Sequence, residues 1–264
     1  MTSFATTSTG TRIAYFESGR PWRPALILTH SLGSDHRMWE PQIEALKNDY
    51  FILAVDNIGH GESSVPAGDY SVNDFAEAVI AVADAAELKR FHFCGLSVGG
   101  ITGLLVAAEH ADRLLSLTVC NSAAKIGSAD LWNQRIETAR TQGMNALVDG
   151  VIARWFTDGF AEREPQLFEQ ARATLLATEP AGYAGVCAAL RDGDLSDSVQ
   201  SVSTPTLVIG GIHDQAAPIE QSRWLGDHIA GSRVVELDAA HLSNLDRAAD
   251  FTPALSQFLS ATTP

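Results

Sequence analysis

The sequence predicts a protein of the α/β class, built on a mostly parallel eight-stranded sheet with helices on both faces. Short runs of β-branched and apolar residues alternate with helical patterns along most of the 264 residues, as they do where helices join parallel strands. The alternation stops after Cys120 and resumes at Pro205, and the residues between them carry helical periodicity without a strand pattern. Since 45% of the residues are hydrophobic, the chain can fill one large core.

The predicted strands are short and apolar, as expected of strands that are buried on both faces. Residues 12–17 close an N-terminal hairpin. The strands after the hairpin are 25–30 (ALILTH), 51–56 (FILAVD), 91–95 (FHFCG), 114–120 (LLSLTVC), 206–211 (TLVIGG) and 233–238 (RVVELD). Because functional sites of open α/β sheets collect at the carboxyl ends of the strands, polar residues directly after these runs are candidates for function.

The clearest helix is predicted at residues 71–88. Ser71 and Asp74 form a capping-box-like pair at its start, and an apolar residue recurs at helical spacing after them. The apolar face consists of Val72, Phe75, Val79, Val82 and Ala86.

Residues 123–202 are predicted to form a helical lid, inserted into the same domain. Gly143, Pro165 and Pro180 are expected to separate about four helices in it. The hydrolase core would then consist of residues 1–122 and 203–264.

Composition narrows the classes of partner and compartment. The net charge of −14 disfavours nucleic acid and anionic membranes, which would repel the chain. The N-terminus lacks the pattern of a signal peptide, and no apolar run approaches the roughly 20 residues that span a bilayer. Cys94, Cys120 and Cys187 lie in apolar runs and are expected to be buried free thiols, so we expect a cytoplasmic protein.

The segment Gly95-Leu96-Ser97-Val98-Gly99 fits the pattern G-x-S-x-G, and it lies between a predicted strand and a predicted helix. In such an elbow the serine has a strained conformation, and a side chain two residues away on either side would strike the turn. Glycines can also mark a tight turn that has no catalytic role. The assignment of Ser97 as a nucleophile therefore depends on partners elsewhere in the chain.

A serine hydroxyl needs a base to take its proton and an acid to orient that base. Where the serine lies on such a strand-turn-helix motif, the acid and then the base both come after it in the chain. His241 lies in the loop directly after the last strand and is the predicted base. His228 is interpreted as a surface residue at a helix end, and His213 as a solvated neighbour of Asp214 that could also line the site.

The predicted acid is Asp214, which follows the strand 206–211. Asp238 also follows a strand, but it is close to His241 in sequence and is expected to shape that loop. Asn121 and Ser122 occupy the other position at which an acid can lie, after the strand 114–120, and neither ionises.

The oxyanion of a tetrahedral intermediate needs backbone N–H donors. Val98, the residue after the nucleophile, is one expected donor, and Leu32, in the loop after the strand 25–30, is the other. His30 in the same loop is expected to brace it by hydrogen bonds. The histidines and cysteines lack the spacing of metal ligands, and no glycine-rich phosphate loop is present, so we predict neither metal nor cofactor.

With these residues assigned, the chain resembles the serine hydrolases of the α/β-hydrolase superfamily and, within it, the enol-lactonase family. The similar stretches run almost end to end: HSLGSDHRMWEPQ, GHGES, FCGLSVGGITG, VCNSAAKIG, RWFTDGFAEREP, GYAGVCAALRDGDL and ELDAAHLSNLD. The resemblance implies an α/β-hydrolase fold with a helical lid. It also implies hydrolysis of the enol-lactone of 3-oxoadipate, a step of aromatic-compound catabolism, through an acyl-enzyme on Ser97.

The implied substrate carries a carboxylate, which a donor or a cation of the lid should meet. The resemblance favours Trp132, and Arg135, Arg154 and Trp155 are further candidates, although each of the four could equally be a packing or surface residue.

Two positions depart from the family pattern. Ile58 stands where an arginine is usual, and His30 stands where an asparagine is frequent. These departures leave open a carboxylesterase, a haloperoxidase-like perhydrolase or a lactonase with another substrate. In each case the partner is a small lactone or ester, and the protein is expected to be a monomer or a small homo-oligomer.

Overall fold

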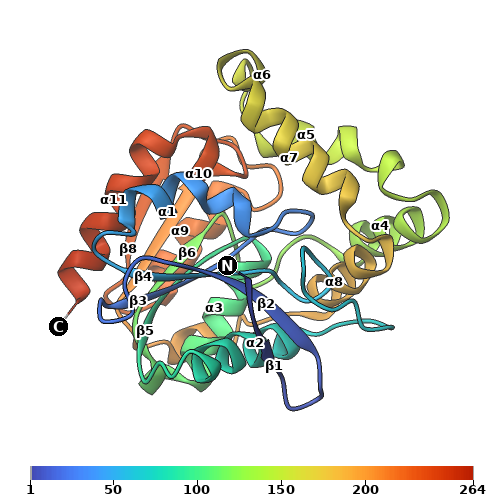
Figure 1. The fold of residues 1–264 in the computed structure, drawn as a ribbon. Coiled ribbons are helices and arrows are strands. Elements are labelled where there is room, and N and C mark those ends of the chain that lie inside the picture. The colour runs from blue at the N-terminus through green and yellow to red at the C-terminus, as the bar shows by residue number, and fades with distance from the viewer. Residues whose placement is uncertain (1, 264) are drawn as a thin grey trace.

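The predicted strands form one sheet in the computed structural model, which describes residues 2–263 (Figure 1). The strands are β1 (Thr2–Thr6), β2 (Arg12–Ser18), β3 (Ala25–Thr29), β4 (Phe51–Val55), β5 (Phe91–Leu96), β6 (Leu114–Cys120), β7 (Thr206–Gly211) and β8 (Arg233–Leu237). Their order in the sheet is β1-β2-β4-β3-β5-β6-β7-β8. Only β2 runs against the others, so the eight-stranded, mostly parallel sheet that the sequence predicts is confirmed.

Helices cover both faces of this sheet. The core helices are α1 (Glu40–Leu46), α2 (Val72–Ala85), α3 (Val98–Glu109), α9 (Ile219–His228), α10 (Ser243–Asp246) and α11 (Ala248–Thr262). Short 3₁₀ turns are η1 (His36–Trp39), η2 (Ala111–Arg113), η3 (Met144–Ala146) and η4 (Val199–Ser201). Figure 1 shows α2 and α3 on one side of the sheet and α1 and α11 on the other, so the strands between them are buried on both faces.

The capping box at the start of α2 is present. Ser71 Oγ accepts from Asp74 N–H at 3.3 Å, and Asp74 Oδ2 accepts from Ser71 N–H at 2.7 Å. The helix ends at Ala85, three residues before the predicted end, because Glu87 has a φ of 55° and cannot continue a right-handed helix.

Between β6 and β7 the chain forms only helices. They are α4 (Ala129–Gln142), α5 (Val148–Trp155), α6 (Phe160–Arg163), α7 (Pro165–Ala177) and α8 (Pro180–Asp192). Gly143 ends α4 with a φ of 75°, while Pro165 and Pro180 each occupy the first position of a helix, where the missing proline N–H has no cost. We call α4 to α8 the inserted helices.

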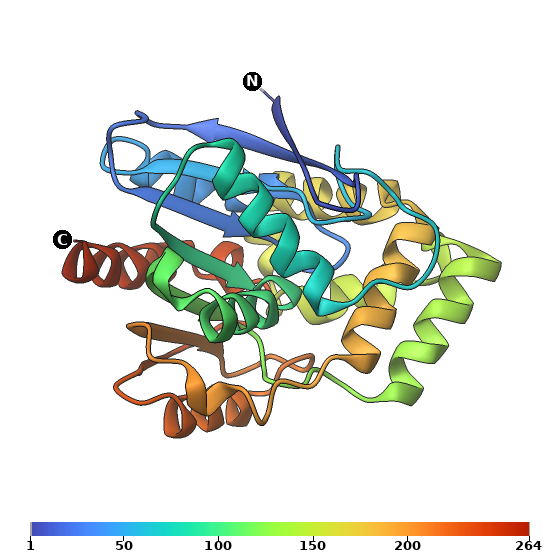
Figure 2. The same ribbon diagram turned by 90° about the horizontal axis from the view of Figure 1, so that it is seen from below.

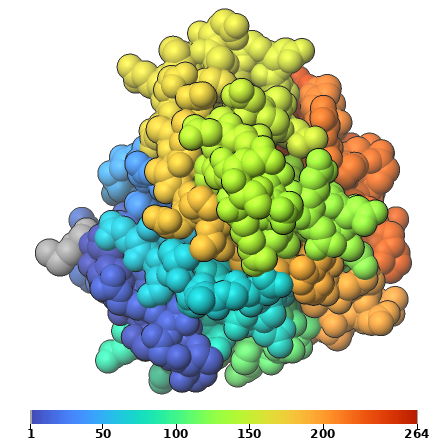
Figure 3. Space-filling view, turned by 90° about the vertical axis from the view of Figure 1, so that its right-hand side faces the viewer, coloured from blue at the N-terminus to red at the C-terminus, as the bar shows by residue number. Residues whose placement is uncertain are grey.

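The inserted helices lie together at one end of the sheet in Figures 1 and 2. In the space-filling view of Figure 3 they are yellow-green to orange and cover the upper part of the face. Residues that follow β3, β5, β7 and β8 line one pocket with residues of α4 and α5. The inserted helices therefore cover the carboxyl ends of the strands.

The cysteines occupy the interior of this fold. Cys94, Cys120 and Cys187 are all buried and free, as the sequence predicts. The Sγ atoms of Cys94 and Cys120, on neighbouring strands, are 3.7 Å apart. Among residues 2–263 there is no helix with the length and apolar character to cross a bilayer.

Candidate active site

Ser97 sits on a strained turn between β5 and α3. Its φ of 59° and ψ of −114° are rarely adopted by a residue with a side chain. A Cβ on Gly95 would strike the carbonyl of Gly99, and a Cβ on Gly99 would come within 2.5 Å of the carbonyl oxygen of Thr29. Both glycines of the motif are thus required by the close approach of backbone to backbone.

Hydrogen bonds with Cys120, the last residue of β6, and with Ser122, two residues further on, hold this turn in place. Ser97 N–H donates to the carbonyl of Cys120 at 2.9 Å, and the Ser122 hydroxyl donates to the carbonyl of Ser97 at 2.7 Å. The serine side chain is therefore presented at a fixed position at the edge of the sheet.

His241 and Asp214 form a buried pair beside Ser97. His241 Nδ1 lies 2.8 and 3.0 Å from the two carboxylate oxygens of Asp214, and both residues are at most 5% exposed. The Asp214 carboxylate also accepts from the N–H groups of Ala216 at 2.8 Å and Ala217 at 3.0 Å. The carboxylate thus accepts from two backbone N–H groups in addition to His241.

These contacts set the charge of Asp214. Burial tends to raise the pKa of this carboxyl, but the charge of His241 and the hydrogen bonds from His241, Asn121 and Ala217 N–H outweigh burial. The pKa of Asp214 therefore lies below the usual value, and the group is ionised at neutral pH. An ionised acceptor fixes the proton of His241 on Nδ1 and leaves Nε2 free to accept one.

Asn121 belongs to the same cluster, although the sequence suggested no role for it. Its Nδ2 donates to Asp214 Oδ2 at 3.0 Å and to the carbonyl of Ala240 at 3.1 Å, and its Oδ1 accepts from the hydroxyl of Ser243. Asn121 also has a φ of 45°, a strained value outside glycine. The residue connects the acid to the loop that carries His241.

Ser97 and His241 line the same pocket but are not hydrogen-bonded to each other in the part of the chain that the structure describes. His241 Nε2 is instead hydrogen-bonded to the hydroxyl of Ser31, at 3.4 Å. Contacts of this kind are often long in the absence of substrate and shorten when it binds.

The loop after β3 brings two free donors to this pocket. The N–H groups of Leu32 and Val98 have no hydrogen-bond partner within residues 2–263. Leu32 lies in the pocket wall with Ser97, and Val98 N–H opens α3, where the helix dipole favours negative charge.

His30 fixes the start of the loop after β3, as the sequence predicts. Its ring accepts from Asn57 N–H at 2.8 Å, and its Nδ1 lies 2.8 Å from the Ser31 carbonyl. Burial lowers the pKa of His30, so the ring stays neutral and holds the loop by hydrogen bonds.

His60 braces the same loop from the turn after β4. Its Nε2 accepts from Gly33 N–H at 2.9 Å, and burial together with the neighbouring His30 lowers the pKa of His60 to about 3. Ile58, which stands where an arginine was expected, is buried in the core instead. The turn therefore supports the loop through neutral His60, with no cation at position 58.

Four residues of the inserted helices that the sequence singled out lie over Ser97. Trp132, Arg135, Arg154 and Trp155 all line its pocket. The Trp132 indole N–H is already used, since it donates to the carbonyl of Ile126 at 2.6 Å, so Trp132 presents only its ring.

The two arginines over the pocket have no acidic partner among residues 2–263. Arg135 lies over the Trp132 ring at 5.3 Å and donates to the hydroxyl of buried Tyr183 at 3.3 Å. Arg154 donates only to the carbonyl of Gly150, at 3.1 Å. Two partly buried cations without counter-ions at one pocket favour an anionic ligand.

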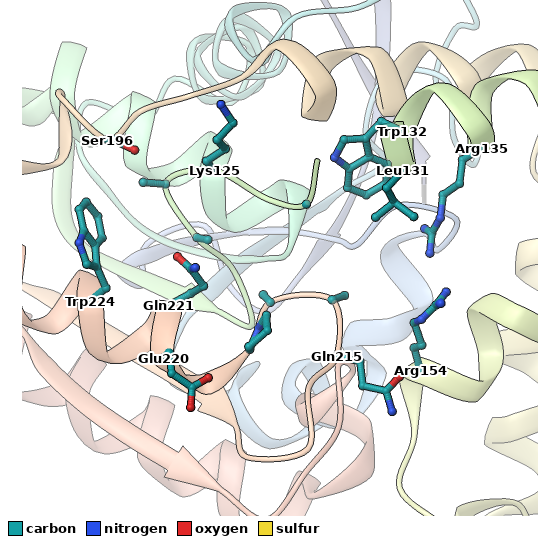
Figure 4. A pocket seen from close by; sticks show the side chains of 16 residues that line it. Lys125, Leu131, Trp132, Arg135, Arg154, Ser196, Gln215, Glu220, Gln221 and Trp224 are labelled. Carbon is teal, nitrogen blue, oxygen red and sulfur yellow. The ribbon is translucent and has the colours of Figure 1, made fainter. Parts of the chain in front are cut away.

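A larger cavity adjoins the pocket over Ser97. It has a volume of about 800 Å³ and shares Trp132, Arg135, Arg154 and Ala216 with that pocket. Figure 4 shows Arg135 and Arg154 pointing toward each other at one side of this outer cavity, with Trp224 at the other. The inner pocket itself is only about 30 Å³, which holds little more than a water molecule.

The inserted helices are joined to the His241 loop by several hydrogen bonds. His241 N–H donates to the Arg154 carbonyl at 3.3 Å, and Leu242 N–H donates to the Trp155 carbonyl at 2.9 Å. Asp246 accepts from both Thr157 N–H and Ala240 N–H. A movement of α5 would therefore also displace the loop that carries His241.

The other histidines considered from the sequence lie outside the pocket. His213 pairs with Asp238 at 2.8 Å, and both side chains are exposed. His228, at the end of α9, stacks on Trp224 with ring centroids 3.9 Å apart. Neither histidine lines the pocket at Ser97.

The fold and the arrangement at the strand ends define an α/β hydrolase, and residues 24–145 match the family model described as the alpha/beta hydrolase fold. The chain is 36% identical over 241 residues to 3-oxoadipate enol-lactonase 2 of Acinetobacter baylyi, spanning 91% of this chain and 90% of that protein. It is 37% identical over 238 residues to 3-oxoadipate enol-lactonase 1 of the same organism, spanning 90% and 89%. The chain belongs to this enol-lactonase family of carboxylic ester hydrolases.

A solved structure agrees with this assignment. The crystal structure of the enol-lactonase from Burkholderia xenovorans LB400 has a TM-score of 0.95 to this one and 42% sequence identity, covering 98% of this chain and 100% of that one. The fold class and the family resemblance that the sequence predicts are thereby confirmed.

Proposed function

We propose that this protein hydrolyses the enol-lactone of 3-oxoadipate to 3-oxoadipate, as a step in the catabolism of aromatic compounds. One observation carries the proposal: two features occur at the same pocket. The first is the buried cluster of Ser97, His241 and Asp214, and the second is a pair of arginines that lack acidic partners. The two relatives that are 36% and 37% identical over 91% and 90% of this chain are named 3-oxoadipate enol-lactonase.

In the proposed reaction Ser97 is the nucleophile, His241 the base and Asp214 the orienting acid. Ser97 Oγ attacks the lactone carbonyl carbon while its proton moves to His241 Nε2. The carbonyl oxygen becomes an oxyanion, which accepts from the N–H groups of Leu32 and Val98.

Collapse of this intermediate breaks the bond between the carbonyl carbon and the ring oxygen. The ring oxygen takes the bonding electron pair and a proton and leaves as an enol, which remains attached to the acyl chain. Water then attacks the acyl-enzyme, gives a proton to His241 and releases Ser97 with its hydroxyl restored.

Arg135 and Arg154 are proposed to bind the carboxylate of the substrate. The protein as a whole is acidic, with a net charge of −14. Two arginines without carboxylate partners make this pocket locally positive, which favours an anionic ligand. Tyr183 holds Arg135 by a hydrogen bond, and the Trp132 ring supports the guanidinium from below. Trp155 forms the apolar wall against which the lactone ring would pack.

Residues 123–202 are proposed to act as a lid on a core of residues 1–122 and 203–264. The inner pocket is too small for a five-membered lactone, so substrate binding must widen it. The outer cavity supplies the path, because it shares Arg135 and Arg154 with the inner pocket. The carboxylate would meet the arginines first and bring the ring to Ser97 behind it.

The test is hydrolysis of the enol-lactone by purified protein, and the reaction is measured as the loss of the enol-lactone absorbance. We expect turnover by the native protein and a loss on the order of 10⁴-fold or more in kcat for Ser97→Ala. A native protein that cleaves 4-nitrophenyl acetate but leaves the enol-lactone intact would show a general carboxylesterase and refute the proposed substrate. Near-normal turnover by Ser97→Ala would refute the mechanism for any ester.

A further inference from the structure

The hydroxyl of Ser31 occupies a position at His241 that the proposed mechanism has not used. Ser31 is 1% exposed and lines the pocket together with Ser97, and its Oγ lies 3.4 Å from His241 Nε2. It makes the only hydrogen bond to that nitrogen within residues 2–263.

The backbone fixes Ser31 at this place. Its carbonyl lies 2.8 Å from His30 Nδ1 and accepts from Ser34 N–H at 3.1 Å, so the loop cannot drift without losing both contacts. These contacts keep the Ser31 backbone beside His241.

The direction of the Ser31 hydroxyl depends on which ring nitrogens of His241 carry a proton. Nδ1 donates to the Asp214 carboxylate, so in the neutral ring Nε2 is an acceptor, and Ser31 Oγ–H must be the donor to it. Once Nε2 has taken the Ser97 proton, it becomes a donor. The Ser31 oxygen then accepts from Nε2, and its own proton is free to turn into the pocket.

We propose that Ser31 is a further catalytic residue that passes the proton from His241 to the leaving oxygen. This inference rests on the proposed ester hydrolysis at Ser97. As the bond between carbonyl carbon and leaving oxygen breaks, the oxygen takes the electron pair and the Ser31 proton, and Ser31 Oγ takes the proton from Nε2. The oxyanion reforms the carbonyl, His241 returns to neutral, and Ser31 ends with one proton as before.

The position of the leaving oxygen gives this relay its use. In an open-chain ester and in a lactone alike, this oxygen stays bonded to the acyl carbon until the bond breaks, so it cannot swing toward Nε2 on its own. A hydroxyl that faces both Nε2 and the pocket extends the reach of the imidazolium to an oxygen in that fixed place.

The relay differs from a purely structural role in its dependence on the leaving group. A strongly basic alkoxide needs a proton as it leaves, whereas 4-nitrophenolate leaves without one. If Ser31 only held His241 in position, its loss would slow every substrate by the same factor.

The experiment compares Ser31→Ala with native protein on the 4-nitrophenyl and the ethyl ester of acetic acid, after active-site titration to count folded enzyme. We expect kcat/KM to fall on the order of 10²-fold for the ethyl ester and by less than about threefold for the 4-nitrophenyl ester. Ser31→Thr, which keeps a hydroxyl, should recover part of the loss on the ethyl ester alone. Ser34→Ala is the matched control, because Ser34 is a buried serine of the same loop that makes no contact with His241.

Equal losses on both esters, or no loss on the ethyl ester, would overturn the relay. A native protein that cleaves the 4-nitrophenyl ester but not the ethyl ester would also overturn it, since no help to an alkoxide would then be present. Failure of the proposed substrate gives a different result, because the enol-lactone would then stay intact while both acetate esters are cleaved. Failure of the mechanism at Ser97 is also distinct, because Ser97→Ala would then leave the cleavage of both esters unchanged.

Discussion

Replacing Ser97 by glycine should stabilise the protein while it abolishes activity. The φ of 59° and ψ of −114° lie close to the first central position of a type II′ turn, a conformation that glycine adopts without strain and other residues do not. Such strain costs about 1–3 kcal/mol. The Ser97 hydroxyl makes no hydrogen bond within residues 2–263, so the substitution removes no such contact.

The gain is reduced by the greater freedom of glycine in the unfolded chain, which costs about 0.5–1 kcal/mol. We therefore expect a net stabilisation of about 1 kcal/mol. For a domain of this size that raises Tm by about 2–4 °C. The assay is thermal unfolding followed by circular dichroism, together with esterase activity.

Ser97→Ala is the matched control, because alanine removes the hydroxyl but keeps the Cβ that causes the strain. Its Tm should stay close to that of the native protein, and both variants should be inactive. If Ser97→Gly were no more stable than Ser97→Ala, the strain at this turn would not be a stability cost, and the reasoning from its dihedral angles would be wrong.

Four further expectations concern the same cluster and its pocket. Arg135→Gln should lose a charged hydrogen bond to the substrate worth about 1.5–3 kcal/mol and raise KM for the enol-lactone about 10- to 100-fold, with KM for a neutral ester unchanged. Asn121→Leu removes one of the hydrogen bonds that lower the pKa of Asp214 and should therefore raise it; a pH titration of the Asp214 carboxyl followed by ¹³C NMR checks this, and an unmoved pKa would deny Asn121 any part in the charge of the acid. Because the folded pKa of Asp214 is depressed, its charge stabilises the native fold above the usual carboxyl range, and urea titrations should show that contribution disappearing as pH falls through the folded pKa. Gly99→Ala should yield little soluble protein, since its Cβ would press on the carbonyl of Thr29.

The fold could be predicted from the sequence because its strands are buried on both faces. A strand such as β5 or β7 then appears as an unbroken apolar run, and the turn after it is marked by glycine. The ends of the helices could not be predicted as closely as the strands. The helix α2 ends at Ala85 because Glu87 is left-handed, and that conformation is fixed by its hydrogen bond to Asp84 and not by a recognisable turn residue.

The positions of Ser97, Asp214 and His241 could be predicted because each follows a strand, and parallel strands finish at one edge. Asn121 also follows a strand, but its amide does not ionise and so does not match the acid of a catalytic triad. Its amide is significant only because the register of β6 against β7 places it beside Asp214, and a one-residue slip would turn the side chain away. Sequence alone does not fix that register.

The two arginines show most clearly what the fold adds to the sequence. Arg135 and Arg154 are on different helices, α4 and α5, and nothing in their spacing distinguishes them from arginines such as Arg140 and Arg191, which pair with Asp69 on the surface. What separates the two groups is the absence of a nearby carboxylate, and that depends on how the inserted helices pack over the sheet. An arginine at a pocket without an acidic partner is available to a substrate, whereas a paired one is already neutralised. The proposed preference for an anionic substrate thus depends on which acidic residues the fold keeps away from the pocket.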